Sequence, residues 1–295
     1  MKSFNIKLLV FSFILIIIMA ILIYAFQNPM NFAVNYNVPL MCRYVDEPTP
    51  INECYYKIAN ATKNSDVCKK INSTAYPTIW DDCFFNIGTH RTDRDTCSYI
   101  IRVPYRDSCY DIIANITNDS DDCELIEDKI IIDNCYFRIA NAVNDEQICK
   151  LINYHFVQKS LCYSTVAVNK GDYTICALDE SSECVANYAK ATGDTSVCNG
   201  VIEANEKARC FSNVATERNN PDVCNNEPNC LSNFAIAHND ETLCPKNSFY
   251  SVSCYMIIAN KKNDTKICDL ITPELDRYTD QKDDKSNCYN LVKNG

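Results

Sequence analysis

The stretch CYYKIANATKNSDVC, residues 54–68, recurs along this chain with small changes. CYDIIANITNDSDDC occupies residues 109–123, and CYMIIANKKNDTKIC occupies residues 254–268. Each copy begins and ends with cysteine, and nine cysteine pairs share this spacing of 14 positions: Cys54/Cys68, Cys83/Cys97, Cys109/Cys123, Cys135/Cys149, Cys162/Cys176, Cys184/Cys198, Cys210/Cys224, Cys230/Cys244 and Cys254/Cys268. A fixed motif that returns about every 26 residues is typical of a tandem repeat.

Within each repeat unit, counted from its first cysteine as position 0, apolar residues occupy positions 0, +1, +4 and +5. Position +1 is aromatic in most units, and position +4 is always Ile, Val, Tyr or Phe. Position +5 is Ala in every unit except the one that contains Gly88. These positions lie on one face of a helix. The sequence therefore predicts a helix whose first cysteine faces the core and whose small +5 residue admits a neighbouring helix.

Positions +9 and +10 predict the end of this helix and the start of another. Position +9 is Asn or Gly in seven of the nine units, and position +10 is Asp in seven. Asn and Gly tolerate the left-handed conformation that ends a helix, and Asp caps the free N–H groups of the next helix. Aliphatic residues at +13 and +17 predict a second helix that runs past the second cysteine. Each unit is then a short helical hairpin.

The even number of cysteines, 20, predicts a disulfide framework in an oxidising compartment. In a hairpin that turns at +9 and +10, the two cysteines of one unit lie ~7 Å out of level on helices ~8–10 Å apart, which exceeds the reach of a disulfide. We therefore favour bridges between neighbouring units, with bridges inside units, such as Cys54–Cys68, as the alternative. The favoured pairs are Cys42–Cys54, Cys68–Cys83, Cys97–Cys109, Cys123–Cys135, Cys149–Cys162, Cys176–Cys184, Cys198–Cys210, Cys224–Cys230, Cys244–Cys254 and Cys268–Cys288.

The N-terminus contains a run of 19 uncharged residues, LLVFSFILIIIMAILIYAF, at positions 8–26. This length suffices to span a bilayer. Lys2 and Lys7 precede the run, so residues 1–7 are expected in the cytoplasm and the rest of the chain outside. A cleaved signal peptide is the alternative, although Ile23-Tyr24-Ala25 is a poor cleavage site. We expect an anchor at 8–26, a short stalk at 27–41 and an extracytoplasmic cysteine-rich repeat domain at 42–295.

Charge argues against a nucleic-acid partner. The net charge is −10, and setting aside the two lysines before the apolar run leaves about −12 for the remainder. A field of that sign repels polyanions. Five Asn-x-Ser/Thr sequons would accept glycans if this part of the chain is outside the cell, at Asn60, Asn72, Asn115, Asn118 and Asn263.

The sequence offers no residues for catalysis, cofactor binding or metal binding. Cys-x-x-Cys is missing, and His90, His155 and His238 fall at different positions of the repeat. The repeated Asp at +10 is explained by helix capping. We therefore expect a protein that is not an enzyme. The aromatic residues at +2, Tyr56, Phe85 and Phe137, are expected to be partly exposed and to contribute to a binding face.

The motif Cys-aromatic-x-x-Ile/Val-Ala-x-x-x-Asn/Gly-Asp-x-x-x-Cys resembles the cysteine-rich tandem repeats of secreted or membrane-anchored archaeal proteins. The resemblance covers residues 42–288 and implies a surface α-helical array without active-site residues. We expect an all-α fold, a disulfide-braced α-solenoid of about nine helical hairpins after a transmembrane helix. The expected function is a scaffold for protein binding or adhesion. A structural component or spacer of the cell envelope is the alternative, and a hydrolase with scattered carboxylates is less favoured.

Overall fold

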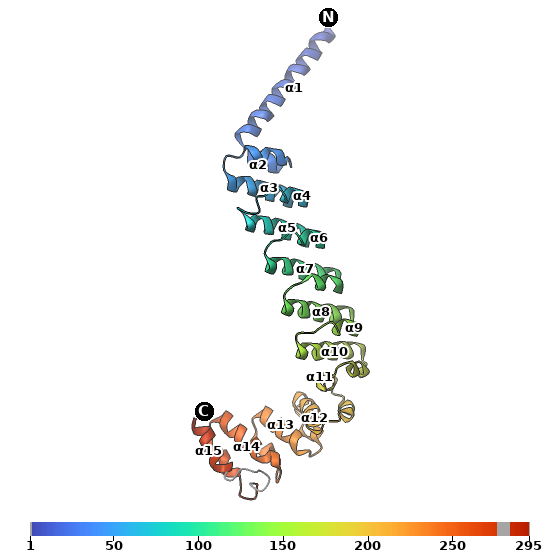
Figure 1. The fold of residues 1–295 in the computed structure, drawn as a ribbon, viewed down its shortest axis with the longest axis vertical. Coiled ribbons are helices and arrows are strands. Elements are labelled where there is room, and N and C mark those ends of the chain that lie inside the picture. The colour runs from blue at the N-terminus through green and yellow to red at the C-terminus, as the bar shows by residue number, and fades with distance from the viewer. Residues whose placement is uncertain (1, 276–283, 295) are drawn as a thin grey trace. The chain divides into compact units, whose positions relative to one another are not determined.

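The computed structural model describes residues 2–275 and 284–294, and Figure 1 shows these residues as helices joined by turns, with no β-strand among them. The expectation of an all-α fold is confirmed for this part of the chain. The structure divides into two compact parts, which we call the N-terminal half (residues 1–139) and the C-terminal half (residues 140–295). The ends of the expected cytoplasmic segment and repeat domain, Met1 and Gly295, lie outside the described residues, as do residues 276–283.

In the N-terminal half, long helices alternate with short elements. The elements are α1 (Lys2–Gln27), α2 (Pro29–Asn35), η1 (Pro39–Tyr44), α3 (Pro48–Thr62), α4 (Ser65–Cys68), α5 (Pro77–Arg91), α6 (Arg94–Cys97), α7 (Val103–Thr117), η2 (Ser120–Leu125) and α8 (Lys129–Val143), the last of which crosses the boundary between the halves. Helices α3, α5 and α7 stack in chain order, each against the next (Figure 1).

The C-terminal half repeats this alternation with less regular lengths. Its elements are α9 (Glu146–Cys149), α10 (Phe156–Lys170), η3 (Tyr173–Leu178), α11 (Glu183–Thr192), η4 (Thr195–Gly200), α12 (Ala204–Arg218), η5 (Pro221–Cys224), α13 (Pro228–His238), η6 (Glu241–Leu243), α14 (Phe249–Lys262), η7 (Thr265–Leu270) and α15 (Asp284–Asn294). Helices α10 to α15 also stack in chain order, each against the next.

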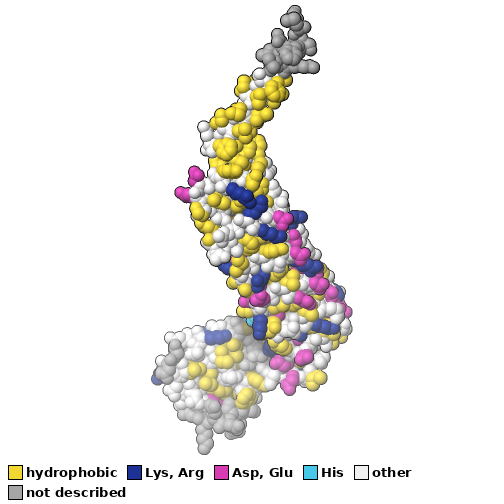
Figure 2. Space-filling view, turned by 45° about the horizontal axis from the view of Figure 1, so that its top comes forward, with side chains coloured by type: hydrophobic (Ala, Val, Ile, Leu, Met, Phe, Trp, Pro, Cys, Tyr) yellow, Lys and Arg dark blue, Asp and Glu magenta, His cyan; other side chains and the backbone are white. Residues whose placement is uncertain are grey.

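Helix α1 is apolar and isolated over most of its length. Its window Val10–Gln27 is long and apolar enough to cross a membrane, and its side chains are almost all exposed. Figure 2 shows these hydrophobic side chains next to the grey N-terminal residues, with charged side chains on the part of the surface that follows them. A helix without a protein partner for its apolar surface is what a bilayer anchor or a secretion signal requires.

The segment expected as a stalk, residues 27–41, is folded. It contains α2 and the start of η1, and α2 packs against both α1 and α3. Ala33 of α2 is fully buried, and the Cys42–Cys54 bridge ties η1 to α3. The segment therefore caps the stack of helices instead of extending from it as a stalk, because its apolar residues find a surface on α3.

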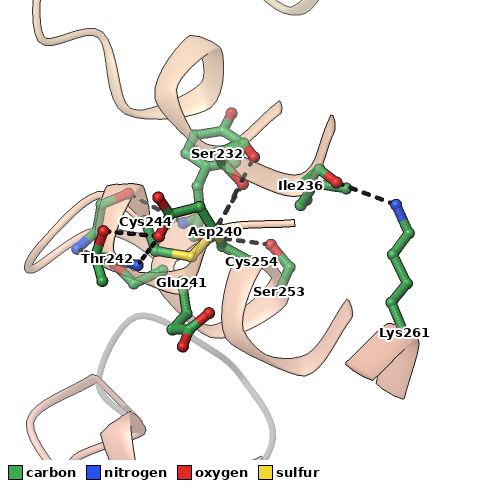
Figure 3. The surroundings of a disulfide bond; sticks show 12 residues. Ser232, Ile236, Asp240, Glu241, Thr242, Cys244, Ser253, Cys254 and Lys261 are labelled. Carbon is green, nitrogen blue, oxygen red and sulfur yellow. Dashed lines mark hydrogen bonds between the residues drawn. A yellow bond between two sulfur atoms is a disulfide. The ribbon is translucent and has the colours of Figure 1, made fainter. Parts of the chain in front are cut away.

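Each long helix ends as its sequence predicts. In every unit the residue at +9 has a positive φ. Lys63 (φ 54°) and Thr92 (φ 51°) share this conformation although they are neither Asn nor Gly. The other +9 residues are Asn118, Asn144, Gly171, Gly193, Asn219, Asn239 and Asn263. The residue at +10 then caps the next element. Asp240 shows the arrangement in Figure 3, where the N–H and the hydroxyl of Thr242 both donate to its Oδ1. The boundary at +9 and +10 is confirmed in all nine units.

The second helix of the unit is much shorter than predicted. It is a single turn of three to six residues, either α or 3-10, and ends at or near the second cysteine. In eight of the nine units the N–H at +17 donates to the carbonyl of that cysteine, as Ile71 does to Cys68 (2.9 Å) and Ile100 to Cys97 (3.0 Å). This i to i+3 bond closes the turn and buries the aliphatic +17 side chain. The +17 residue is apolar because the chain turns inward there, and not because a helix continues.

The long helix begins earlier than its cysteine motif suggests. In α3, α5, α7 and α10 it starts six residues before the first cysteine. Three prolines, Pro77, Pro104 and Pro228, lie in the first turn of a long helix. Proline fits there because the first N–H groups of a helix have no partner inside it.

The ten disulfides join neighbouring units in the favoured order, from Cys42–Cys54 to Cys268–Cys288, with Cα–Cα distances of 5.4 to 5.9 Å. The sulfur atoms are packed closely. In Figure 3, Sγ of Cys254 lies 3.9 Å from the carbonyl oxygen of Ser232. A Cβ placed on Gly88 would lie 3.1 Å from the sulfurs of both Cys97 and Cys109. The +5 position is therefore small because the next bridge lies against it.

A repeated buried polar residue at position −2 anchors the linkers of the N-terminal half, and the sequence patterns missed it. Asp107 accepts hydrogen bonds from the N–H groups of Glu127 (3.1 Å) and Asp128 (2.9 Å). Asp81 accepts from Ile101 (2.8 Å) and from Arg102 (N–H 3.3 Å, Nε 2.6 Å). Asn52 accepts from the N–H of a single linker residue (2.8 Å). We call Asn52, Asp81 and Asp107, with the linker groups they bind, the linker clasp.

Candidate functional site

The surface that faces away from the disulfides is formed by positions −1, +2, +3, +6 and +7 of the long helices. We call these positions the front face. Positions 0, +4 and +5 are buried in every unit. Position +2 is half-buried where it is aromatic and is buried in α10 to α13, where it is Ser164, Ala186, Ser212 and Ser232. The three hollows described below are lined mainly by front-face residues. Those residues differ from one unit to the next.

One hollow is an open groove of ≈ 460 Å³ in the C-terminal half. It runs across three consecutive long helices, α10, α11 and α12, and has a lining of small polar and aliphatic side chains. Lys190 and Glu217 form an ion pair at its edge, with 3.5 Å between Nζ and Oε2. The residues that line it are Leu161, Ser164, Thr165, Val168, Asn187, Lys190, Ala191 and Glu217.

A second hollow of ≈ 250 Å³ continues the first along α11, α12 and α13. Lys190 lines both, so the two hollows adjoin each other along α10 to α13. Asn213 and Asn233 present amide groups there, and Arg209 lies beside them. We call this combined surface, α10 to α13, the front groove.

Ion pairs fix the charged side chains at the rim of the front groove. Arg209 pairs with Glu183 through Nη1 (2.6 Å) and also with Glu206. The Ser182 hydroxyl donates to Glu206 (2.8 Å), and this hydrogen bond, followed by Arg209, holds the pKa of Glu206 below its usual range. The Glu206 carboxylate is held ionised by its neighbours, an arrangement typical of a structural pair and unlike the raised pKa of a general acid.

The N-terminal half has a smaller hollow of ≈ 260 Å³ between α3 and α5, lined by Glu53, Tyr56, Lys57, Ile79 and Asp82. Tyr56 is half-buried, and its hydroxyl accepts a hydrogen bond from Asn86 Nδ2 (2.9 Å). Phe85 and Phe137 are half-buried as well. The expected partial exposure of the +2 aromatics is confirmed, whereas their role in binding stays a prediction.

Among the described residues, no cluster of three or more His, Cys, Asp or Glu side chains could hold a metal ion. The histidines lie in unrelated places: His90 near the end of α5, His155 before α10, and His238 against the ring of Phe234 (centroids 4.3 Å apart). The expectation that the chain has no catalytic, cofactor or metal residues stays a prediction.

The five sequons lie at three kinds of position. Asn60 and Asn115 occupy position +6 on the front face of α3 and α7, Asn118 and Asn263 end helices with positive φ, and Asn72 lies in a linker. Four of the five are exposed, and Asn60 is half-buried, with Lys63 Nζ donating to its Oδ1 (3.1 Å). Glycans at Asn60 and Asn115 would cover part of the front face in the N-terminal half.

No protein-family model matches this chain, and no curated protein or solved structure matches it. The relevant features are an apolar N-terminal helix, a disulfide-linked helical repeat, and grooves along its front face.

Proposed function

We propose that this chain is a membrane-anchored extracytoplasmic scaffold that binds a protein segment along its front face, without catalytic activity. The observation that carries the proposal is the front groove, which crosses four consecutive long helices and is open along its length. Residues that hold the repeat together are nearly constant between units, whereas the lining of the groove changes from unit to unit. Stacked repeats with constant cores and variable faces form extended binding surfaces.

The groove lining favours an extended polypeptide as the ligand. Asn187, Asn213 and Asn233 lie at position +3 of successive units and line the groove. An amide side chain both donates and accepts, so a row of them can pair with the peptide groups of a bound chain. Leu161 and Val168 add apolar contacts at the same surface. Small-molecule sites are usually more enclosed and more apolar.

The location follows from the cysteines and from α1. Ten disulfides are typical of an oxidising compartment, and α1 supplies one apolar segment of spanning length. With both early lysines before that segment, we place the N-terminus in the cytoplasm and the disulfide-braced α-solenoid outside. The resemblance to secreted or anchored archaeal repeat proteins agrees with this placement.

A structural spacer of the cell envelope is the second candidate, and the sequons favour it. Asn60 and Asn115 would place glycans on the front face of α3 and α7. A glycosylated face in the N-terminal half would hold neighbouring molecules apart and leave no continuous binding surface there. The two candidates differ in whether the front groove is occupied.

Photo-crosslinking tests the proposal. A benzoylphenylalanine is placed in the full chain at Leu161, a front-groove residue that is 43% exposed, and separately at Tyr173, which is 51% exposed and lies outside the groove. The cells are irradiated, and adducts are identified by mass spectrometry. Binding predicts a discrete protein adduct from Leu161 that Lys190→Glu abolishes, and no such adduct from Tyr173. Equal or absent adducts at both positions would favour the spacer.

A further inference from the structure

The residues that follow α1 form a second unusual surface. Residues 8–42 contain no charged side chain, although 22% of the chain is charged. The uncharged stretch thus continues well beyond the apolar window, which ends at Gln27, and covers all of α2 and the first part of η1. Water solvates charged side chains, so exposure to water alone does not explain why this folded segment of an acidic protein has no charged residue.

Aromatic rings surround the C-terminal end of α1. Tyr24 of α1 contacts Phe32 of α2 (ring centroids 6.4 Å apart), and Phe32 contacts Tyr36 (4.7 Å). Phe26 of α1 contacts Tyr44 of η1 (5.8 Å). We call Tyr24, Phe26, Phe32, Tyr36 and Tyr44 the aromatic collar.

The collar residues remain exposed although they contact one another. Phe26, Tyr36 and Tyr44 keep 64%, 63% and 54% of their surface accessible, and the neighbouring Leu40 keeps 57%. Exposed aromatic and aliphatic side chains in one patch mark a surface that is covered in use. The patch is continuous with α1, and Figure 2 shows hydrophobic side chains extending from that helix onto the adjoining surface.

The collar is also held firmly to the first repeat unit. Ala25 of α1 and Ala33 of α2 are buried, which brings these two helices close together. Helix α2 packs on α3, and the Cys42–Cys54 bridge joins η1 to the same helix. The collar is therefore packed on the first repeat unit and covalently tied to it, unlike an anchor on a free linker.

We propose that the aromatic collar lies in the headgroup region of the bilayer and docks the first repeat unit directly onto the membrane surface. Tyr and Phe rings with Leu40 fit that layer, since amphipathic aromatic side chains concentrate at membrane interfaces. The absence of charge from residues 8–42 fits as well, because burying a charge at this depth is costly. This inference rests on the membrane anchorage included in the proposed function, and it adds that the repeat begins at the membrane without a stalk.

Quenching by brominated lipid tests the docking. Trp80 is the single tryptophan, so Trp80→Phe gives a dark background for one reporter at a time in the full chain. The reporters are Tyr36→Trp and Tyr44→Trp in the collar, Ile16→Trp in α1, and Phe156→Trp as a control of similar exposure in the C-terminal half. Each variant is reconstituted in phosphatidylcholine nanodiscs, with and without bromine on the acyl chains near the headgroups.

Docking predicts that both collar reporters lose emission in brominated discs to the same order as Ile16→Trp, while Phe156→Trp keeps its emission. If Ile16→Trp is quenched but the collar reporters behave like Phe156→Trp, anchorage stands and docking is overturned. If no reporter is quenched, the anchorage itself is wrong and the docking falls with it. Where Trp80→Phe does not fold, Trp80 is retained and its own quenching is subtracted.

Discussion

The N-terminal and C-terminal halves hold their linkers by different chemistry. In the N-terminal half, position −2 carries Asn52, Asp81, Asp107 and Asp133, all buried. In the C-terminal half the same position is Ser160, Ser182, Ala208, Pro228 and Val252. The bridges that join N-terminal units span 12 to 15 positions, whereas those farther along span 6 to 20. A carboxylate that accepts hydrogen bonds from two consecutive backbone N–H groups fixes the course of the linker. Linker length can therefore vary more in the units that lack this carboxylate.

Removal of a clasp carboxylate should have the largest effect on stability. Asp107→Ala leaves the N–H groups of Glu127 and Asp128 without an acceptor, and each such loss costs about 1–3 kcal/mol, so about 4 kcal/mol in all. Urea denaturation measures the total, and hydrogen exchange at residues 127 and 128 localises it.

Ser160→Ala is the matched control in the C-terminal half. Its hydroxyl makes one hydrogen bond, to Ser181 (3.0 Å), so the loss should be only about 1 kcal/mol. Equal losses for the two variants would contradict the difference drawn between the halves.

The loss of stability on removing a disulfide should differ less between the two halves than the loss on removing the residue at position −2. Replacing both cysteines of Cys68–Cys83, which are 15 positions apart, should cost roughly 3 kcal/mol in the chain-entropy account. Replacing those of Cys224–Cys230, which are 6 apart, should cost roughly 2 kcal/mol. Denaturation of the two alanine double variants measures both values. A larger loss for the shorter loop would show that the bridge acts through packing and not through loop closure.

The helix ends provide a pair of smaller, opposite changes. Thr92 is a β-branched residue at φ 51°, so Thr92→Gly should stabilise the N-terminal half by roughly 0.5–1 kcal/mol after the entropy cost of glycine. Gly171 has φ 65° and an added Cβ would meet no atom within 4 Å, so Gly171→Ala should destabilise the C-terminal half by about 1 kcal/mol through the backbone alone. Thermal unfolding measures both, and changes of the same sign would refute the left-handed requirement at +9.

The smallest expected effect is the loss of stability at low pH that comes from the Asp residues capping the short helices of the C-terminal half. The Thr174 side chain, and then its N–H, hold the pKa of Asp172 below 3.8, and Thr242 does the same for Asp240. Because the folded pKa is lowered, this stabilisation is present above the ordinary aspartate pKa and is lost as the pH falls through the folded value. Thr174→Ala should weaken folding at neutral pH and converge with the parent chain in acid. Parallel urea midpoints at every pH would contradict this linkage.

Much of the local structure follows from short patterns in the sequence. Asn or Gly at +9 and Asp at +10 identify the turn, and the all-α fold and the order of the bridges follow from that turn. Lys63 and Thr92 show that neighbouring units impose the left-handed residue even where the side chain does not favour it. The prediction of a longer second helix was wrong. An aliphatic residue at +17 fits the period of a helix, but in the structure it lies at the end of a single turn.

The candidate site could be predicted only in part from the sequence. The aromatic residues at +2 indicated a binding face, but the front groove needs Lys190 and Asn213 from different units to lie together. The linker clasp had a signal, the Asp repeated at −2 as Asp81, Asp107 and Asp133, but that signal lies outside the span from first to second cysteine on which the repeat was defined.

The sequence by itself determined the apolar N-terminal segment, the helical repeat, its turns and its cysteine spacing, because these depend on residues within one or two helical turns of each other. Only the tertiary structure decided the course of the linkers, the folding of residues 27–41 onto α3, and the front groove. Those features depend on pairs about 20 or more positions apart, such as Asp107 with Glu127. Periodicity within a helix cannot specify such contacts, because which residues meet is set by how one unit packs on the next.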